Sequence, residues 1–280
     1  MIYHYIELFM FKKTLILLTA VALFTSCLKE VSKYEQQEHT DTVNAQGIEL
    51  YMRTHKVVDS EYGPMIETAN DGDPDNLWET RRTTPVTKTT PYADLVGHAF
   101  MDTTKVKVVE PSGDTVERAT GIWLYVHNEG YYNQFPVDSS AVLVKYTGYL
   151  LNDEPFAIQP TGATFYLNSS TITGFSAGMK YFQPGHLEEV TYEGSDKTYM
   201  SYEHGGTGLL IIPSKFAYGD EVSGSIPPNS VLVFNINLLS IADYIPDGEE
   251  FEKGMVLKHN CSLTKWMSML PISSYIAPKK

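Results

Sequence analysis

Two apolar runs that flank a polar loop constrain the fold of this chain more than any other feature. The first run, 209–212, stops at a proline, and the second, 231–236, follows a pair of prolines. Short apolar runs bounded by proline or glycine are typical of buried strands. The loop between them carries Tyr218 and Ile226, and large apolar side chains in a polar loop suit a ligand contact. The sequence therefore predicts a strand, an exposed loop and a second strand over this stretch.

The pattern from residue 118 onward predicts a sheet and a single helix. Runs of β-branched and aromatic residues predict three further strands, at 121–126, 141–146 and 165–167. Phe175, Met179 and Phe182 recur at i, i+4 and i+7, which is the apolar stripe of a helix packed on a sheet. This order of strands, one helix and further strands favours an α+β fold with an antiparallel β-sheet wrapped on a single α-helix.

Composition shifts divide the chain into five segments. They are a signal peptide (1–26), a flexible tether (27–45), an extension or small subdomain of unknown role (46–117), the α+β domain (118–243) and a C-terminal tail (244–280). Within the extension, residues 68–93 are rich in Asp, Asn, Thr and Pro and predict a long loop. Two strands are expected after it, near 95–100 and 106–109.

The N-terminal sequence predicts export and lipid attachment. Lys12 and Lys13 precede an apolar run, 14–24, that is too short to span a membrane comfortably. Small residues then lead to Cys27, as in a bacterial lipoprotein signal. We expect Cys27 to become the lipidated N-terminus, which would hold the protein in the bacterial cell envelope, at the periplasmic face or the cell surface. An ordinary signal peptide with a coincidental cysteine is the alternative.

Charge and ligand spacing disfavour several classes of function. The net charge of −13 leaves no basic excess, so we expect no nucleic-acid partner. Residues 71–76 imitate a calcium loop, but Asn76 stands at the glycine position and Arg82 at the bidentate glutamate position. We therefore expect a solvated acidic loop there. The eight histidines show no metal-binding spacing, so we predict no metal and no cofactor.

Residues 174–178 read Gly-Phe-Ser-Ala-Gly and match the nucleophile elbow of hydrolases. A hydrolase of that class needs repeated strand–helix–strand units and a histidine late in the fold. Only one convincing helix is predicted, and His186, His204 and His259 lack such a setting. A hydrolase is therefore disfavoured.

A series of short motifs between 118 and 243 resembles a known family. The motifs are Val-Lys-Tyr-Thr-Gly at 144–148, Phe156, Phe-Tyr-Leu at 165–167, Ile-Thr-Gly-Phe-Ser-Ala-Gly-Met at 172–179, Ala-Tyr-Gly at 217–219, Ile-Pro-Pro at 226–228 and Leu-Val-Phe at 232–234. Each is weak alone, but their order and spacing resemble those of FKBP-type peptidyl-prolyl cis-trans isomerases. The resemblance covers less than half of the chain.

The resemblance implies an apolar pocket. Its catalytic side chains would be Tyr146, Phe156, Tyr218 and Phe234, and its substrate pocket would be lined by Phe165, Ile172, Phe175 and Ile226. Phe175 would form the floor. The Tyr218 hydroxyl and the Ile226 backbone N–H would hold substrate carbonyls.

Four departures from the family pattern bear on activity. Ala157 replaces an aspartate of the pocket rim, Thr171 replaces a valine, Phe175 replaces a tryptophan, and residues 186–206 are inserted after the helix.

The resemblance implies an isomerase that helps exported proteins fold, with proline-containing polypeptides as partners and the membrane reached through the N-terminal lipid. The alternatives are a non-catalytic peptide-binding module and a structural envelope lipoprotein whose pocket is filled by the insertion or the tail. The departures at Ala157 and Thr171 favour the peptide-binding module, whereas the retained Tyr146, Phe156, Tyr218 and Phe234 favour the enzyme.

Overall fold

The computed structural model describes residues 33–60, 63–87, 89–109, 113–168, 171–191 and 196–243. The predicted signal peptide, Cys27 and the C-terminal tail lie outside these residues. The chain divides into two units, Met1–His39 and Thr40–Lys280. The fold described below is that of the second unit. No helix among the described residues is long and apolar enough to cross a membrane.

Within the residues that the structure describes, the elements are two α-helices, two 3-10 helices and twelve strands. They are α2 (Lys33–Thr54), β1 (His55–Val58), β2 (Met65–Thr68), η1 (Tyr92–Asp94), β3 (Ala99–Met101), β4 (Lys105–Val109), β5 (Thr115–Ala119), β6 (Trp123–Asn128), β7 (Ser140–Tyr149), β8 (Pro155–Tyr166), α3 (Thr173–Met179), β9 (His186–Thr191), β10 (Thr198–Glu203), β11 (Gly206–Ile212), η2 (Ser214–Phe216) and β12 (Leu232–Asp243).

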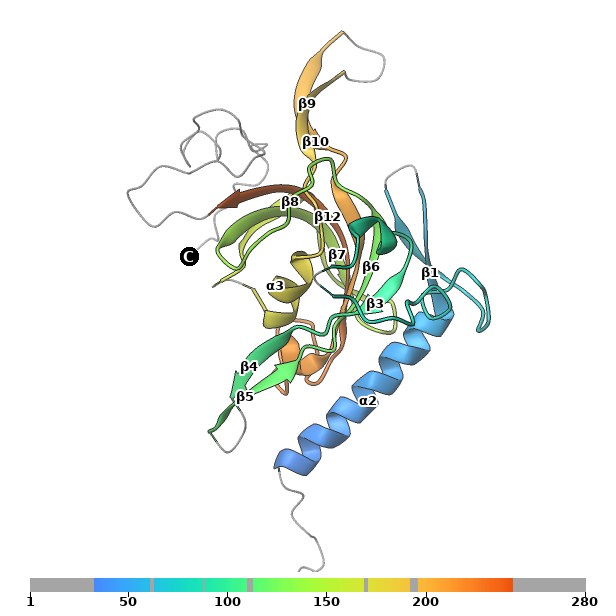
Figure 1. The fold of residues 1–280 in the computed structure, drawn as a ribbon, viewed down its shortest axis with the longest axis vertical. Coiled ribbons are helices and arrows are strands. Elements are labelled where there is room, and N and C mark those ends of the chain that lie inside the picture. Colours follow the sequence, from blue (N-terminus) through green and yellow to red (C-terminus); the bar gives the residue numbers. More distant parts are fainter. Residues whose placement is uncertain are drawn as a thin grey trace, which may run out of the picture. The chain divides into compact units, whose positions relative to one another are not determined.

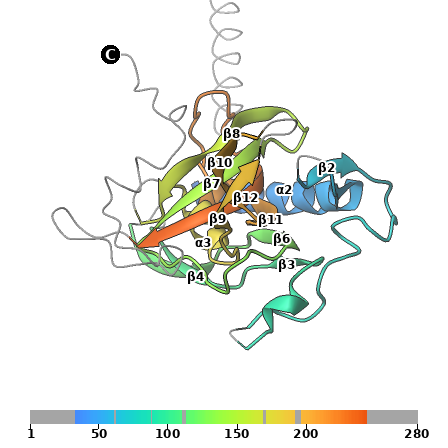
Figure 2. The ribbon, with the colours of Figure 1, turned by 90° about the horizontal axis from the view of Figure 1, so that it is seen from above.

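A six-stranded antiparallel sheet in the order β3-β6-β11-β12-β7-β8 forms the centre of the fold (Figure 1). Helix α3 packs on one face of this sheet, which confirms the predicted α+β architecture. The structure adds a second cover, because α2 from Ile48 onward packs on the other face. Figure 2 shows β11 and β12 lying between the two helices.

Strand β11 explains why its sequence reads as a continuous apolar run. Every one of its residues is buried. Leu210 and Ile212 point to the face with α3, and Leu209 and Ile211 point to the face with α2. Successive side chains of a strand point to opposite faces, so an unbroken apolar run is what two-sided burial requires.

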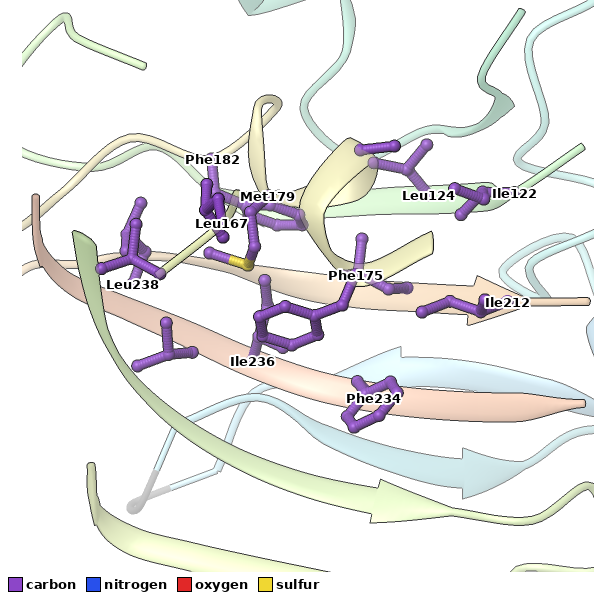
Figure 3. Close-up of a cluster of buried hydrophobic side chains, with 14 of the residues drawn as sticks. Ile122, Leu124, Leu167, Phe175, Met179, Phe182, Ile212, Phe234, Ile236 and Leu238 are labelled. Atoms are coloured by element: carbon purple, nitrogen blue, oxygen red, sulfur yellow. The ribbon is translucent and has the colours of Figure 1, made fainter. Parts of the chain in front are cut away.

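Two glycines let the short helix α3 approach the sheet closely. A Cβ at Gly174 would lie 2.2 Å from Ile212 Cγ2, and one at Gly178 would lie 2.6 Å from Leu210 Cδ2. Phe175 and Met179 fill the space between helix and sheet (Figure 3). The predicted stripe ran to Phe182, but α3 ends at Met179 and Phe182 is buried in the turn that follows.

Two predictions about secondary structure were wrong in extent. The flexible tether expected over 27–45 is helical from Lys33, where α2 begins. The strand expected at 165–167 begins at Pro155, so β8 includes two prolines. Strand β8 lies at the edge of the sheet, where proline is tolerated because an edge strand leaves some N–H groups unpaired.

The extension before residue 118 is partly built into the sheet. Strand β3 pairs with β6 and forms the edge opposite β8. Strands β1 and β2 form a separate hairpin, as do β4 and β5. The insertion after α3 forms a third hairpin, β9–β10, that projects beyond the sheet (Figure 1).

The acidic loop at 71–76 is exposed at Asp71 and Asp75, as predicted, but it ends in a buried residue. Asn76 is fully buried. Its side-chain amide donates to the Arg53 carbonyl at 3.1 Å, and its Oδ1 accepts from the Glu79 N–H at 2.8 Å. Asn76 thus ties the loop to the end of α2. Among the described residues, no three His, Cys, Asp or Glu side chains are grouped so that they could hold a metal ion.

Candidate functional site

Five of the eight predicted site residues form one continuous cluster of aromatic rings, which we call the aromatic cluster. Ring-centroid distances are 5.2 Å for Phe165–Phe175, 5.4 Å for Phe175–Phe234, 5.5 Å for Phe156–Phe234, 5.7 Å for Tyr146–Phe165 and 5.8 Å for Tyr146–Phe234. Two of these pairs meet edge to face, and all are within the range of favourable ring contacts. The sheet and α3 therefore bring together residues that are widely separated along the chain.

The strand register explains why these rings meet. Phe234 on β12 is paired with Gly148 on β7. A Cβ at Gly148 would lie 2.4 Å from the Phe156 ring, so only glycine leaves room for that ring over β7. The Tyr-Thr-Gly motif thus supplies both a ring of the cluster, Tyr146, and the space for its neighbour.

The aromatic cluster has a buried part and a more accessible part. Phe175 and Phe234 are buried, with 3% and 7% of their surface exposed. Tyr146, Phe156 and Phe165 are only half-buried against the same core. Figure 3 shows Phe175 extending from α3 toward β12, where Phe234 lies. Phe175 therefore occupies the position expected of a floor, with half-buried rings around it.

Tyrosine hydroxyls are the polar groups beside these rings. Burial raises the pKa of the Tyr146 hydroxyl, and the neighbouring Tyr218 raises it further. Because the ordinary value is about 10, Tyr146 stays neutral at physiological pH and can donate a hydrogen bond. The aromatic cluster therefore offers apolar surface and one neutral hydroxyl, that of Tyr146.

The loop between β11 and β12 carries the remaining predicted aromatic residue. Tyr218 is 40% exposed, and Gly219 after it takes a positive φ of 61°. Tyr218 raises the pKa of the Tyr146 hydroxyl, so its own hydroxyl lies near the aromatic cluster. Ile226 is buried in the same core, and Ile172, immediately before α3, is partly buried against it. All eight predicted residues thus belong to this side of the sheet or to the adjoining loop.

One predicted role conflicts with the structure. The Ile226 backbone N–H donates to the Ser223 carbonyl at 2.9 Å, and the Ser223 N–H donates to the Ile226 carbonyl at 3.1 Å. Ile226 therefore closes a turn within the loop. Its N–H cannot hold a substrate carbonyl while that turn is formed.

Two departures from the family pattern have a clear structural consequence. Ala157 pairs with Gly148 across β7 and β8, and its methyl group offers no hydrogen-bond acceptor to the rim of the cluster. Thr171 is hydrogen bonded to the Ser176 hydroxyl, which in turn donates to the Leu167 carbonyl at 2.7 Å. Thr171 and Ser176 therefore fix the chain where it enters α3.

These contacts argue against the hydrolase interpretation. The hydroxyl of Ser176 is committed to the backbone before α3. His186 lies on the β9–β10 hairpin, where its Nε2 is 2.8 Å from Glu188 Oε2, and His204 stacks on it at 5.5 Å between centroids. His259 lies outside the described residues. The serine and the described histidine candidates therefore have separate roles.

A further contact to the Tyr218 loop was missed from the sequence. Asn44 on α2 reaches Ser214, at the start of the loop, with 2.6 Å between the two side chains. No sequence pattern indicates this contact, because residue 44 stands in a polar stretch that predicts a tether.

The geometry is that of an α+β domain with a buried aromatic floor and a half-exposed tyrosine, Tyr218, on an adjoining loop. Residues 132–239 match the family model described as FKBP-type peptidyl-prolyl cis-trans isomerase. Over these residues the chain is therefore similar to the FKBP-type peptidyl-prolyl isomerase family.

Individual relatives match the same part of the chain. The FKBP-type isomerase FkpA of Aeromonas hydrophila is 31% identical over 121 residues, which cover 42% of this chain and 37% of the relative. The isomerase FKBP14 of Homo sapiens is 35% identical over 124 residues, 44% of this chain and 52% of the relative. The crystal structure of FkpA from Escherichia coli is similar at 32% identity and a TM-score of 0.34, over 44% of this chain and 48% of that one. The matches span about half or less of each relative.

Proposed function

We propose that this protein is a peptidyl-prolyl cis-trans isomerase that assists the folding of exported proteins. The observation that carries the proposal is the aromatic cluster, in which Phe175 and Phe234 are buried beneath half-buried rings and Tyr218 stands on the adjoining loop. The substrates would be polypeptides with an X–Pro bond, whose proline ring suits an aromatic surface. The proposal needs no metal, cofactor or nucleophile.

The physical basis of such catalysis is the change in the amide as it twists. Rotation about the peptide bond has a barrier of about 18–20 kcal/mol, which arises from resonance in the planar state. The twisted amide has lost much of its resonance and dipole, so an apolar, water-poor site favours it over the planar ground state. Each reduction of about 1.4 kcal/mol in the barrier speeds the rotation tenfold.

The tyrosine hydroxyls would position the substrate in this mechanism. The Tyr218 hydroxyl would donate to a substrate carbonyl and so fix the peptide across the aromatic cluster. Tyr146 keeps its proton, because burial raises its pKa. No proton has to move during the reaction, so the rate should vary little with pH between about 6 and 9.

A non-catalytic peptide-binding module is the second candidate. Two observations favour it: Ala157 offers no acceptor at the rim of the cluster, and the Ile226 N–H is engaged with Ser223. A module of this kind would bind proline-containing peptides through the same rings without accelerating their isomerisation. Binding without turnover distinguishes it from the enzyme.

We also infer a location in the bacterial cell envelope, with the protein held to the membrane by a lipid on Cys27. The basic, apolar and small-residue order of residues 12–27 supports this, as does the similarity to bacterial FkpA proteins. The net charge of −13 supports polypeptide rather than nucleic-acid partners. A Cys27→Ser variant should leave the membrane fraction. If the variant stays in that fraction, the lipid anchor is excluded.

The proposed activity is tested by prolyl isomerisation of a set of X–Pro peptides with the wild-type protein and Tyr218→Ala. The matched control is Tyr199→Ala, since Tyr199 on the β9–β10 hairpin is also 40% exposed but lies outside the cluster. We expect acceleration by the wild type and by Tyr199→Ala, and a loss of about tenfold or more in Tyr218→Ala. Equal activity of all three proteins would exclude the assigned site.

A further inference from the structure

We propose that Asn44 of α2 is a positioning residue for the loop that carries Tyr218. This inference rests on the proposed function only in taking that loop as part of the isomerase site. The loop runs from Ser214 to Asn229, between β11 and β12, and we call it the Tyr218 loop. Helix α2 lies on the face of the sheet opposite the aromatic cluster, so Asn44 acts on the site through the base of the loop.

Asn44 bridges the two ends of the Tyr218 loop. Its side chain is buried, with 5% of the residue exposed. When the amide is oriented so that donors face acceptors, its oxygen accepts from the Ser214 hydroxyl at 2.6 Å and from the Ser214 N–H at 3.2 Å. Its nitrogen then donates to the Asn229 carbonyl at 3.2 Å. One side chain therefore holds the first and the last residue of the loop.

The same two residues define the shape of the loop's base. The Ser214 carbonyl accepts from the N–H groups of Ala217 at 2.9 Å and Gly219 at 2.8 Å. The Gly219 carbonyl accepts from the Asn229 N–H at 2.7 Å. Tyr218 therefore lies between Ala217 and Gly219, whose N–H groups both donate to the Ser214 carbonyl. The hydrogen bond from Asn229 to Gly219 links the end of the loop to the same group of residues. A shift of Ser214 relative to Asn229 would move Tyr218.

The hydrogen bond from Asn44 acts on a residue with an unusual backbone conformation. Asn229 takes a φ of 61°, in the left-handed region that asparagine tolerates better than most residues other than glycine. A hydrogen bond to its carbonyl from a buried amide holds the residue in that conformation. Without Asn44, the Asn229 carbonyl and the Ser214 N–H would lose these partners. A loop conformation that exposes both groups to water then becomes more favourable.

A second contact from α2 acts on the same segment. Asp41 lies three residues before Asn44, on the same side of the helix, and its Oδ2 is 2.8 Å from the Lys215 Nζ. Both side chains of this pair are about one-third exposed, so water weakens the interaction. The buried Asn44 contact should therefore matter more than the ion pair.

The inference is tested in the full chain with Asn44→Ala and two controls. Val43→Ala changes an adjacent, 51% exposed position of α2 whose side chain has no group that could hydrogen-bond to the loop. Ile48→Val weakens the packing of α2 on the sheet, because Ile48 is buried there, but removes no polar contact to the loop. Alanine is a good helix former, so Asn44→Ala leaves α2 able to form.

Amide hydrogen exchange and steady-state kinetics give two independent readouts. We expect Asn44→Ala to speed exchange of the Gly219 and Asn229 amides by about tenfold, with β11 and β12 unchanged. We expect kcat/KM to fall by a similar factor. Val43→Ala should match the wild type in both. Ile48→Val should change exchange evenly over the sheet, without a selective effect on the loop.

Two results would overturn the inference. One is unchanged exchange of the Gly219 and Asn229 amides in Asn44→Ala. The other is an increase spread evenly over the sheet, as in Ile48→Val, which would give Asn44 a general structural role. If the wild-type protein accelerates no prolyl isomerisation, the proposed function fails, and the exchange data alone still decide whether Asn44 holds the loop.

Discussion

The two faces of the six-stranded sheet are built from the same strands but differ in what they leave accessible. On the face that α3 covers, the core ends in the aromatic cluster, whose outer rings Tyr146, Phe156 and Phe165 are only half-buried. On the face that α2 covers, the central residues are mostly aliphatic, and Met52 and Val233 have no exposed surface.

We interpret this difference as a division between a face that forms the candidate site and a face that stabilises the sheet. A short helix leaves aromatic rings uncovered at its end, which suits a site that must admit a peptide. A longer helix seals the opposite face and stabilises the strands that carry those rings. Substitutions of the sheet-facing residues on the two faces should therefore separate loss of function from loss of stability.

The largest expected effect comes from Phe234→Ala on the α3 face. Phe234 is 7% exposed and contacts three other rings of the cluster. Its loss should lower the free energy of unfolding by about 3–5 kcal/mol and abolish isomerase activity or peptide binding. Chemical denaturation and an isomerase assay measure the two effects. A folded variant with full activity would remove Phe234 from the site.

Met52→Ala on the α2 face should lose stability without losing function. Met52 is fully buried against the sheet, so truncation should cost about 2–5 kcal/mol. The aromatic cluster lies on the other face, so we expect kcat/KM per folded molecule to stay within about twofold of the wild type. The same denaturation and assay apply, at a temperature where the variant is folded. A loss of activity as large as that of Phe234→Ala would mean that the two faces are not independent.

The smallest expected effect is a difference in alkaline sensitivity between buried tyrosines of the two faces. Burial raises the pKa of Tyr51 on the α2 face, and the nearby carboxylate of Asp153 adds to this. Burial also raises the pKa of Tyr146. Both groups keep their protons in the folded state while the unfolded chain loses them near pH 10, so stability is unaffected below that pH and falls above it.

Tyr51→Phe should therefore reduce this alkaline loss by up to about 1.4 kcal/mol per pH unit above pH 10. Tyr146→Phe should have a smaller effect, because Tyr146 is only half-buried. Urea denaturation at pH 8 and pH 11 provides the comparison. An equal pH dependence in the wild type and Tyr51→Phe would show that Tyr51 ionises as easily in the folded state as in the unfolded state.

The sequence was sufficient to predict the α3 face of the fold. Phe175 and Met179 at helical spacing, with the apolar runs at 209–212 and 231–236, indicated a helix packed on an antiparallel sheet. The structure confirms that architecture, and it groups five of the predicted aromatic residues in one cluster. These patterns are local, and their periodicity reports directly which face is buried.

The α2 face was harder to predict for physical reasons. The unbroken apolar run at 209–212 does imply burial on both faces, but it does not say what provides the second cover. The covering helix begins in a polar stretch, and its apolar stripe of Ile48, Tyr51 and Met52 is short. Its helical state depends on packing against the sheet, which local propensity does not report.

The hydrogen bonds of the loop were equally invisible in the sequence. The pairing of Ile226 with Ser223 and the bridge from Asn44 to Ser214 join positions whose proximity depends on the folded loop. Polar residues in a loop can bond to many partners. Only the path of the backbone decides which one is reached.

The most direct test of the proposed function is two-dimensional exchange NMR on an Ala–Pro peptide with a small amount of the wild-type protein. The spectrum reports the rate of cis–trans exchange and, through intermolecular contacts, which rings lie against the proline. Uncatalysed isomerisation takes tens to hundreds of seconds, and we predict that the protein makes it much faster. We also predict contacts from the proline ring to Phe175 and Phe234. A folded protein that leaves the exchange at its uncatalysed rate, or that contacts the peptide elsewhere, would contradict this account.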